Sequence, residues 1–371
     1  MKFMRAHWDW LLIGAVAVLS MALVFSVNGI YDTRIDGPAY AGQISSFASG
    51  AAFSADPAVM IRLFKPLYAI IGGSLLHSTH PYAVIFGLNI IFYLLLAISA
   101  RALLSLLGFS KQMSLAGTLW IITAYPLLKY GLALGTDISG WFFATATLAV
   151  GLYALKKDSL FILCLASFLG FLGATAKETG PLGLIALCVL IAWRFRRKGF
   201  KAIAVRCLAA GLPALILYAV LIAVIAGQAP SFLDWFSQNK ATYGAQYHTL
   251  FKWAAIEASA FGLLWIAAAR GLISRIRARA CENADFLVIA FCATLPVLAW
   301  PLFISRIMFI QFLWVIPLAL YGLSSFQSYA AAHMPNRAKA LTACMIAAPI
   351  VFNALLFLAG ARGSLFSFIG G

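Results

Sequence analysis

Long apolar runs alternate with short polar stretches along nearly the whole chain. About eleven of these runs have about 17 to 25 residues, enough for a helix to cross a hydrocarbon core of about 30 Å. They lie near residues 8–28, 82–107, 112–130, 137–155, 159–176, 180–195, 203–227, 252–271, 285–303, 308–325 and 340–361. The pattern predicts an all-α fold: a polytopic membrane bundle of about eleven transmembrane helices, with residues 1–371 as a single transmembrane domain.

Two longer polar segments interrupt the runs, residues 29–81 and residues 228–251, which we call the first and second outer loops. In the first outer loop Gly37 and Pro38 mark a turn followed by a helix start. The next apolar residues follow the helical period and share one face: Tyr40, Ile44 and Phe47. We expect an interfacial helix that lies along the bilayer surface. Residues 64–76 are apolar but too short to cross, which predicts a second interfacial or a re-entrant helix.

Composition and charge agree with this topology. Hydrophobic residues make up 63% of the chain, charged residues 10%, and mean hydropathy is +0.95, which excludes a soluble globular protein. With a cytoplasmic N-terminus, most of the 27 Lys and Arg residues fall in inner loops, as the positive-inside rule requires. Basic clusters beside the spans face anionic lipid headgroups, so the net charge of +16 needs no nucleic acid partner. The predicted location is the bacterial inner (plasma) membrane.

Acidic side chains gather at the predicted outer ends of the spans. Asp32 and Asp36 stand four residues apart in the first outer loop, and Asp36 directly precedes the predicted helix. Two interpretations of Asp36 stay open, a helix-capping carboxylate and a catalytic one. Asp32 is either a loop carboxylate paired with Arg34 or a functional acid. Asp137 opens the fourth span, where a helix cap is again the alternative.

Cations lie on the same side. Lys177 stands with Glu178 in the tight connection between the fifth and sixth spans, where the two form either a local ion pair or part of a site. Arg62 and Lys65 are both compatible with snorkelling to the headgroups. Arg306 begins a late span on the side where positive charge is disfavoured, which suggests a bound anion. Two tyrosines could stack on a sugar or belong to an aromatic belt: Tyr31 and Tyr40.

The order of these elements resembles the GT-C superfamily of integral-membrane glycosyltransferases, in the branch related to protein mannosyltransferases and aminoarabinose transferases. The resemblance runs over most of residues 1–325. It rests on an Asp in a Tyr-rich first outer loop, an Arg-x-x-x-Pro-Leu stretch (Arg62 to Leu67), a Thr-Asp pair (Thr136 and Asp137), a Thr-x-Lys-Glu-x-Gly connection (Thr175 to Gly180) and an Arg with a Pro eleven residues on (Arg306 and Pro317).

The resemblance implies a membrane glycosyltransferase that takes a sugar from a polyprenyl-phosphate carrier at the outer face, usually with inversion. By that likeness Asp36 matches the catalytic acid, with Asp32 as the competing assignment. Lys177 and Arg306 match positions that face the carrier phosphate, and the lipid tail would lie in a groove open to the bilayer. Arg62 is a further candidate for the phosphate.

Elementary chemistry is compatible with these roles. A carboxylate can accept the proton of the acceptor hydroxyl, and cations can stabilise the departing phosphate. Glu178 and Asp137 would orient Lys177 or bind sugar hydroxyls, and the two tyrosines would contact the sugar. The chain carries no soluble domain after residue 361, which favours a lipid or glycan acceptor over a peptide.

Alternatives stay open. A multi-pass transporter or lipid-carrier flippase would use the outer acids for protons or cations and Arg306 for an anionic substrate. A non-catalytic scaffold would leave Asp36, Lys177 and Arg306 as independent surface residues. No cofactor is fixed by the sequence. A divalent cation is compatible with the acids and histidines of the first outer loop, although their spacing fixes no coordination geometry: Asp32, Asp36, His77 and His80.

Overall fold

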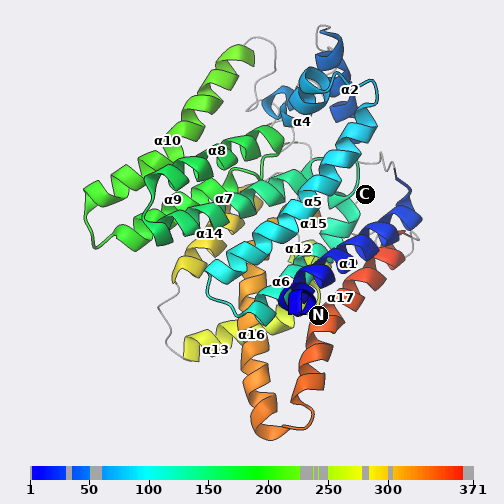
Figure 1. Cartoon of the computed structure of the whole chain (residues 1–371), viewed down its shortest axis with the longest axis vertical. Coiled ribbons are helices and arrows are strands. Elements are labelled where there is room, and N and C mark those ends of the chain that lie inside the picture. The colour runs from blue at the N-terminus through cyan, green and yellow to red at the C-terminus, as the bar shows by residue number, and fades with distance from the viewer. Residues whose placement is uncertain are drawn as a thin grey trace.

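The computed structural model describes residues 2–30, 36–50, 61–225, 250–277, 284–299 and 304–361, together with residues 237 and 241. This part of the chain is all-helical (Figure 1). The elements are α1 (Lys2–Asn28), α2 (Gly37–Ser49), η1 (Ile61–Phe64), α4 (Leu67–Ala69), η2 (Ile70–Leu75), α5 (Pro81–Leu106), α6 (Lys111–Ile122), η3 (Leu127–Gly131), α7 (Asp137–Lys157), α8 (Leu160–Ala176), α9 (Leu182–Phe195), α10 (Phe200–Ile225), α12 (Leu250–Phe261), α13 (Leu264–Arg277), α14 (Ala284–Ala299), α15 (Ser305–Met308), η6 (Phe309–Gln311), α16 (Phe312–His333) and α17 (Ala338–Ala361).

Six described helices are long and apolar enough to cross a membrane, and a seventh candidate is a bent pair. The six are α1, α5, α7, α10, the continuous run α15–α16 and α17. A multi-pass helical membrane bundle is therefore confirmed. The finer count of about eleven stays a prediction, because α8, α9 and the apolar part of α14 are shorter than such a helix needs.

Two of the predicted spans are interrupted for local reasons. The run at residues 112–130 leaves the helix after Ile122, because Pro126 has no amide hydrogen to continue the ladder to the Ile122 carbonyl. The run at residues 252–271 bends by 94° between α12 and α13. Gly262 takes a φ of +48° at this bend, a conformation that favours glycine. The span predicted over residues 252–271 is therefore a bent pair of helices and not one continuous helix.

The first outer loop contains the predicted helix, but its apolar face is covered differently. Helix α2 begins at Gly37 with a proline in its first turn, as predicted. Tyr40 and Ile44 are buried, and the Tyr40 ring lies 6.2 Å from the ring of Tyr68 in α4. A Cβ on Gly73 of η2 would lie 2.6 Å from the Ile44 carbonyl oxygen, so the two backbones touch. The stripe thus packs on α4 and η2, and the prediction that it faces the bilayer surface was wrong.

Helix α7 is buried along most of its length and lies between α5, α8 and α9 (Figure 1). Glycine allows the closest approach in this region, since a Cβ on Gly183 of α9 would lie 2.1 Å from the Ala144 carbonyl oxygen. Residues 61–75 form the short elements η1, α4 and η2, none of which is long enough to cross a membrane. Together α2, α7 and the α8–α9 connection place the polar site.

A buried ion pair joins α1 to α5. The Asp9 carboxylate contacts the Arg101 guanidinium, and both side chains are buried, while Lys111 Nζ lies 3.4 Å from Asp9 Oδ1. Removing one partner of a buried pair leaves the other charge without compensation, which costs about 3 to 5 kcal/mol. We expect Asp9→Ala to lower the midpoint of thermal unfolding in detergent clearly. Asp158→Ala, which removes a largely exposed acid, is the control and should change it little. Equal midpoints for Asp9→Ala and wild type would show that the pair contributes nothing.

Candidate active site

Six ionisable side chains from distant segments meet in one place, which we call the charge cluster. Asp36 comes from the start of α2, Asp137 from the first turn of α7 and Arg306 from α15. Lys177 and Glu178 come from the α8–α9 connection and Lys65 from the segment between η1 and α4. Every member lies within 4 Å of an oppositely charged member, and the cluster holds three acids and three cations.

Asp36 occupies the N-cap position of α2, yet its carboxylate makes no capping hydrogen bond. Its Oδ2 instead accepts a hydrogen bond of 3.4 Å from Arg306 Nη1 and lies 3.8 Å from Lys177 Nζ. The next residue, Gly37, touches the loop before α7, since a Cβ there would lie 2.8 Å from the Leu134 carbonyl oxygen. The helix-capping interpretation of Asp36 was therefore wrong, and the close approach at Gly37 brings the carboxylate to the cations.

Lys177 is the most enclosed cation of the cluster, with a side chain only 4% exposed. Its Nζ lies 3.2 Å from Asp137 Oδ1, 3.7 Å from Glu178 Oε1 and 3.8 Å from Asp36 Oδ2. Burial alone would lower the pKa of Lys177, but the Asp137 and Glu178 carboxylates outweigh it and raise the pKa above its ordinary value. The ammonium therefore stays charged.

The backbone around Lys177 fixes its position. Lys177 ends α8 in an extended conformation, and its amide donates to the Gly173 carbonyl. A Cβ on Gly180 would lie 2.2 Å from the Gly173 carbonyl oxygen, so the connection folds tightly onto the last turn of α8. On the other side, a Cβ on Gly140 of α7 would lie 2.8 Å from Lys177 Cβ. These contacts leave the Lys177 side chain little freedom to turn away.

Arg306 bridges two acids at the more open edge of the cluster. Its Nη1 lies 3.4 Å from Asp36 Oδ2 and 3.6 Å from Asp137 Oδ2. Lys177 contacts the same two carboxylates, so acids and cations alternate around a small ring. Asp36 is 24% and Arg306 18% exposed, whereas Asp137 and Lys177 are each 4% exposed. Asp36 and Arg306 therefore form the edge that a ligand can reach.

Glu178 binds two lysines. The predicted local pair with Lys177 is present at 3.7 Å, but the shorter contact, 2.7 Å, is with Lys65 Nζ. Burial alone would raise the pKa of Glu178, but the Lys177 and Lys65 ammonium groups outweigh it and hold the pKa well below its usual range. The sequence gives no sign that Lys65 pairs with Glu178 and not with headgroups, because the two stand 113 positions apart.

A buried polar network behind the acids supports the loop that precedes α7. The Tyr40 side chain is buried, and its hydroxyl accepts a hydrogen bond of 2.9 Å from Thr136 Oγ1, next to Asp137. Asn89 of α5 donates to the carbonyls of Ala133 and Gly135, at 2.6 and 3.0 Å. Sequence reasoning missed Asn89, although a buried polar residue inside an apolar span is a signal for such a role.

Several predicted site residues lie outside the described part of the chain. Asp32 and Tyr31 are among them, and of Arg62 only the backbone, in η1, is described. Most of the second outer loop also lies outside the described residues. Among the described residues, no three His, Cys, Asp or Glu side chains form a group suited to a metal ion. The carboxylates of the charge cluster are interleaved with cations.

An apolar groove of about 530 Å³ begins at Lys65 and Glu178 and continues between α8, α9 and α10. We call it the tail groove. Most of its lining is aliphatic or aromatic, and small residues of α10 widen it, among them Gly211 and Ala214. A polar end beside the charge cluster and an apolar remainder suit a ligand with a charged head and a hydrocarbon tail.

No protein-family model matches the sequence, and no curated protein matches it. Solved structures do resemble the fold. The archaeal oligosaccharyltransferase AglB from Archaeoglobus fulgidus, in complex with an inhibitory peptide and a dolichol-phosphate, superposes with a TM-score of 0.64 at 12% identity over 96% of this chain and 56% of that chain. The Archaeoglobus fulgidus oligosaccharyltransferase tethered to an acceptor peptide gives 0.63 at 13% identity over 100% of this chain and 56% of that chain. The chain thus spans little more than half the length of these structures, and identities this low show the fold alone.

Proposed function

We propose that this chain is a membrane glycosyltransferase of the GT-C type that moves a sugar from a polyprenyl-phosphate carrier to a lipid or glycan acceptor. The observation that carries the proposal is the charge cluster, in which Asp36, Lys177 and Arg306 come together from three distant segments. Independent surface residues, as in a scaffold protein, have no reason to converge. The fold likeness to an oligosaccharyltransferase solved with dolichol-phosphate supports a lipid-phosphate donor.

The reaction is a displacement at the anomeric carbon of the donor. The acceptor hydroxyl oxygen attacks this carbon and gives its proton to the Asp36 carboxylate, while the bond from the carbon to the phosphate oxygen breaks. Inversion of the anomeric centre follows from a single attack. The leaving phosphate gains negative charge, which Arg306 and Lys177 stabilise.

Donor binding also frees the base. In the structure Asp36 Oδ2 is paired with Arg306 Nη1 at 3.4 Å. A phosphate suits the forked donors of an arginine, and by binding Arg306 it replaces Asp36 as that partner. The carboxylate is then available to accept a proton. Lys177 is held more deeply by Asp137 and Glu178 and supplies a fixed positive charge beside the phosphate.

The remaining assignments belong to the same proposal. Asp32 is the competing base, Arg62 a further phosphate ligand and Tyr31 a sugar contact. Tyr40, Asp137 and Glu178 act by holding the cluster in place. The bias of Lys and Arg toward inner loops puts the cluster at the outer face of a bacterial inner membrane, in a chain of about eleven spans and a single domain.

The direct test uses purified protein in lipid nanodiscs with a radiolabelled polyprenyl-phosphate sugar and an envelope extract as acceptor. We expect label to move from the carrier into a lipid or glycan fraction. A flippase would instead move the labelled carrier across liposome membranes without breaking its sugar bond. Transmembrane movement of intact donor with no transfer would therefore replace this proposal by its rival.

The tail groove yields a separate prediction. Gly211→Leu adds a side chain on the groove wall, where the nearest atom to a new Cβ is Cys188 Sγ at 3.9 Å. We expect the KM for a long-chain donor to rise about ten-fold, a loss of about 1.4 kcal/mol in binding. A short-chain donor should be affected much less. Leu212→Phe, on the exposed side of the same helix, is the matched control. An unchanged KM in Gly211→Leu would place the tail elsewhere.

A further inference from the structure

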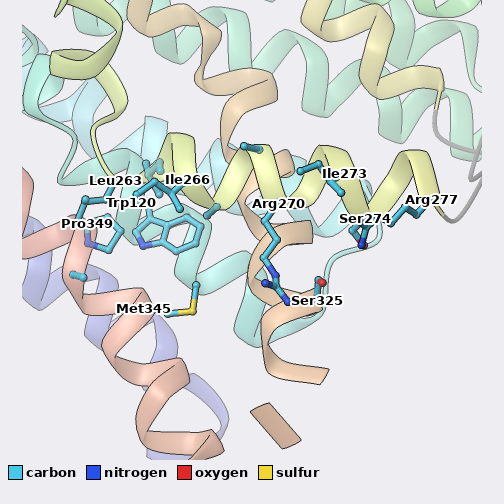
Figure 2. Close-up of a pocket in the computed structure, with 14 residues that line it drawn as sticks. Trp120, Leu263, Ile266, Arg270, Ile273, Ser274, Arg277, Ser325, Met345 and Pro349 are labelled. Atoms are coloured by element: carbon cyan, nitrogen blue, oxygen red, sulfur yellow. The ribbon is translucent and has the colours of Figure 1, made fainter. Parts of the chain in front are cut away.

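A second cavity lies at the other end of the bundle. It measures about 1000 Å³ and is lined by α13, the middle of α16, α17 and Trp120 of α6 (Figure 2). Ser325 on its wall comes 19 residues after Arg306 in one continuous helical run. At 1.5 Å per residue the two are about 28 Å apart, close to the thickness of a hydrocarbon core. The cavity and the charge cluster thus belong to opposite interfaces of the membrane.

Helix α13 owes its position to the bend at Gly262. The 94° turn lays α13 across α16, and two glycines allow the helices to touch. A Cβ on Gly271 would lie 2.0 Å from the Leu318 carbonyl oxygen, and one on Gly322 would lie 1.9 Å from that of Ala267. Helix α13 turns 94° away from α12 and carries Arg270, Arg275 and Arg277 among apolar residues, a composition that suits the membrane interface.

One outward face of α13 lines the cavity. Its residues are spaced three or four apart, Ile266, Arg270, Ile273 and Arg277, and Leu263 in the turn before the helix continues the row. Ile266 is 71% and Ile273 50% exposed within the chain. These exposed isoleucines alternate with arginines along the face, which indicates a surface that an amphiphile covers.

The wall has a charged end and an apolar end. Arg270, Ser274, Arg277 and Ser325 lie toward one end, and the Arg270 side chain points to Ser325 (Figure 2). The other end holds Trp120, Leu263, Ile266, Met345 and Pro349 (Figure 2). Among the residues that the structure describes, no carboxylate lies within 4 Å of Arg270 or Arg277. The Arg270 guanidinium also lies 5.9 Å from the ring centroids of Phe326 and Tyr329.

We propose that this cavity is a binding site for one anionic phospholipid of the membrane. The phosphate binds Arg270 and Arg277, with Ser274 and Ser325 donating from their hydroxyls, and an acyl chain runs along Ile266 to Trp120 and Pro349. A free phosphate would leave the apolar half exposed, and an uncharged lipid would leave both arginines unmatched. The positive-inside bias assigns this end to the cytoplasmic leaflet, where anionic lipids attract basic segments. The site is distinct from the sugar-transfer chemistry and does not depend on it.

The test measures lipid retention. Purified protein is reconstituted in nanodiscs of equal phosphatidylglycerol and phosphatidylcholine, released into native mass spectrometry, and scored for the lipid that stays bound. We expect one phosphatidylglycerol to be retained, with at least ten-fold lower retention in Arg270→Gln/Arg277→Gln. The control is Arg196→Gln/Arg197→Gln, which removes two exposed arginines of another inner basic cluster and should retain the lipid.

A second variant addresses the apolar half. Ala348→Trp fills the α17 side of the cavity without changing charge, and we expect it to lose the lipid as well. It also replaces the arginine variant should that one fail to fold. Equal retention in wild type and either folded variant would overturn the proposal, as would retention of phosphatidylcholine to the same extent. Displacement of the lipid by millimolar inorganic phosphate would show a phosphate site in place of a lipid site.

Discussion

Replacing Asp36 by asparagine is expected to lower the rate of sugar transfer by about 10²- to 10⁴-fold. Asparagine keeps the size of the side chain and an oxygen that can accept the hydrogen bond from Arg306 Nη1. It cannot accept a proton from the acceptor hydroxyl. The loss should therefore appear in kcat, with a smaller change in the KM for the donor, and it is measured with the labelled donor in nanodiscs.

Two further variants make this result specific. Asp32→Asn should retain most of the activity if Asp36 is the base, and the reverse pattern would exchange the two assignments. Asp158→Asn removes a largely exposed acid that pairs with Arg206 at the opposite end of α7 from Asp137, and should behave as wild type. Full activity in Asp36→Asn would contradict the assignment of Asp36 as the base.

Arg306→Gln is expected to lower kcat/KM by about 10²- to 10³-fold, the usual cost of removing one donor from a developing negative charge. The reason is twofold, since Arg306 both binds the leaving phosphate and releases Asp36 when it does so. Arg306→Lys should recover only part of the loss, because an ammonium is a point charge without the forked geometry.

The contrasting interpretation of Arg306 is a side chain that merely reaches outer headgroups. In that case Arg306→Gln transfers sugar at the wild-type rate. Arg337→Gln, an exposed arginine in the turn between α16 and α17, is the matched control for loss of one positive charge. The two variants should differ by at least ten-fold if the phosphate assignment holds.

Every member of the charge cluster except Lys65 could be named as a site candidate from local sequence. Asp137, Lys177 and Arg306 stand at the ends of apolar runs and Asp36 lies in the first outer loop, and the charge bias of the loops favours one side of the membrane for all of them. The sequence could not show which of these side chains contact one another. The pairing of Lys65 with Glu178 spans 113 positions and depends on how η1 packs against the α8–α9 connection. No periodicity encodes that contact.

The errors have equally specific causes. Hydropathy measures how apolar a run is and not its direction, so the run at residues 252–271 gave no sign of the bend at Gly262. The sequence pattern also cannot distinguish whether lipid or protein covers the apolar stripe of α2. Here Tyr68 and the paired glycines of η2 cover it, because Gly72 and Gly73 carry no side chains and let α2 come close.

The charge balance of the cluster has a consequence for turnover. With three acids against three cations, the resting site has no net charge to draw in small anions from the surroundings. A sugar phosphodiester brings one negative charge, but the phosphomonoester left after transfer carries about 1.5 to 2 negative charges at neutral pH. On the proposed function, Asp36 then competes with this product for Arg306, so re-forming the Asp36–Arg306 pair favours release of the spent carrier.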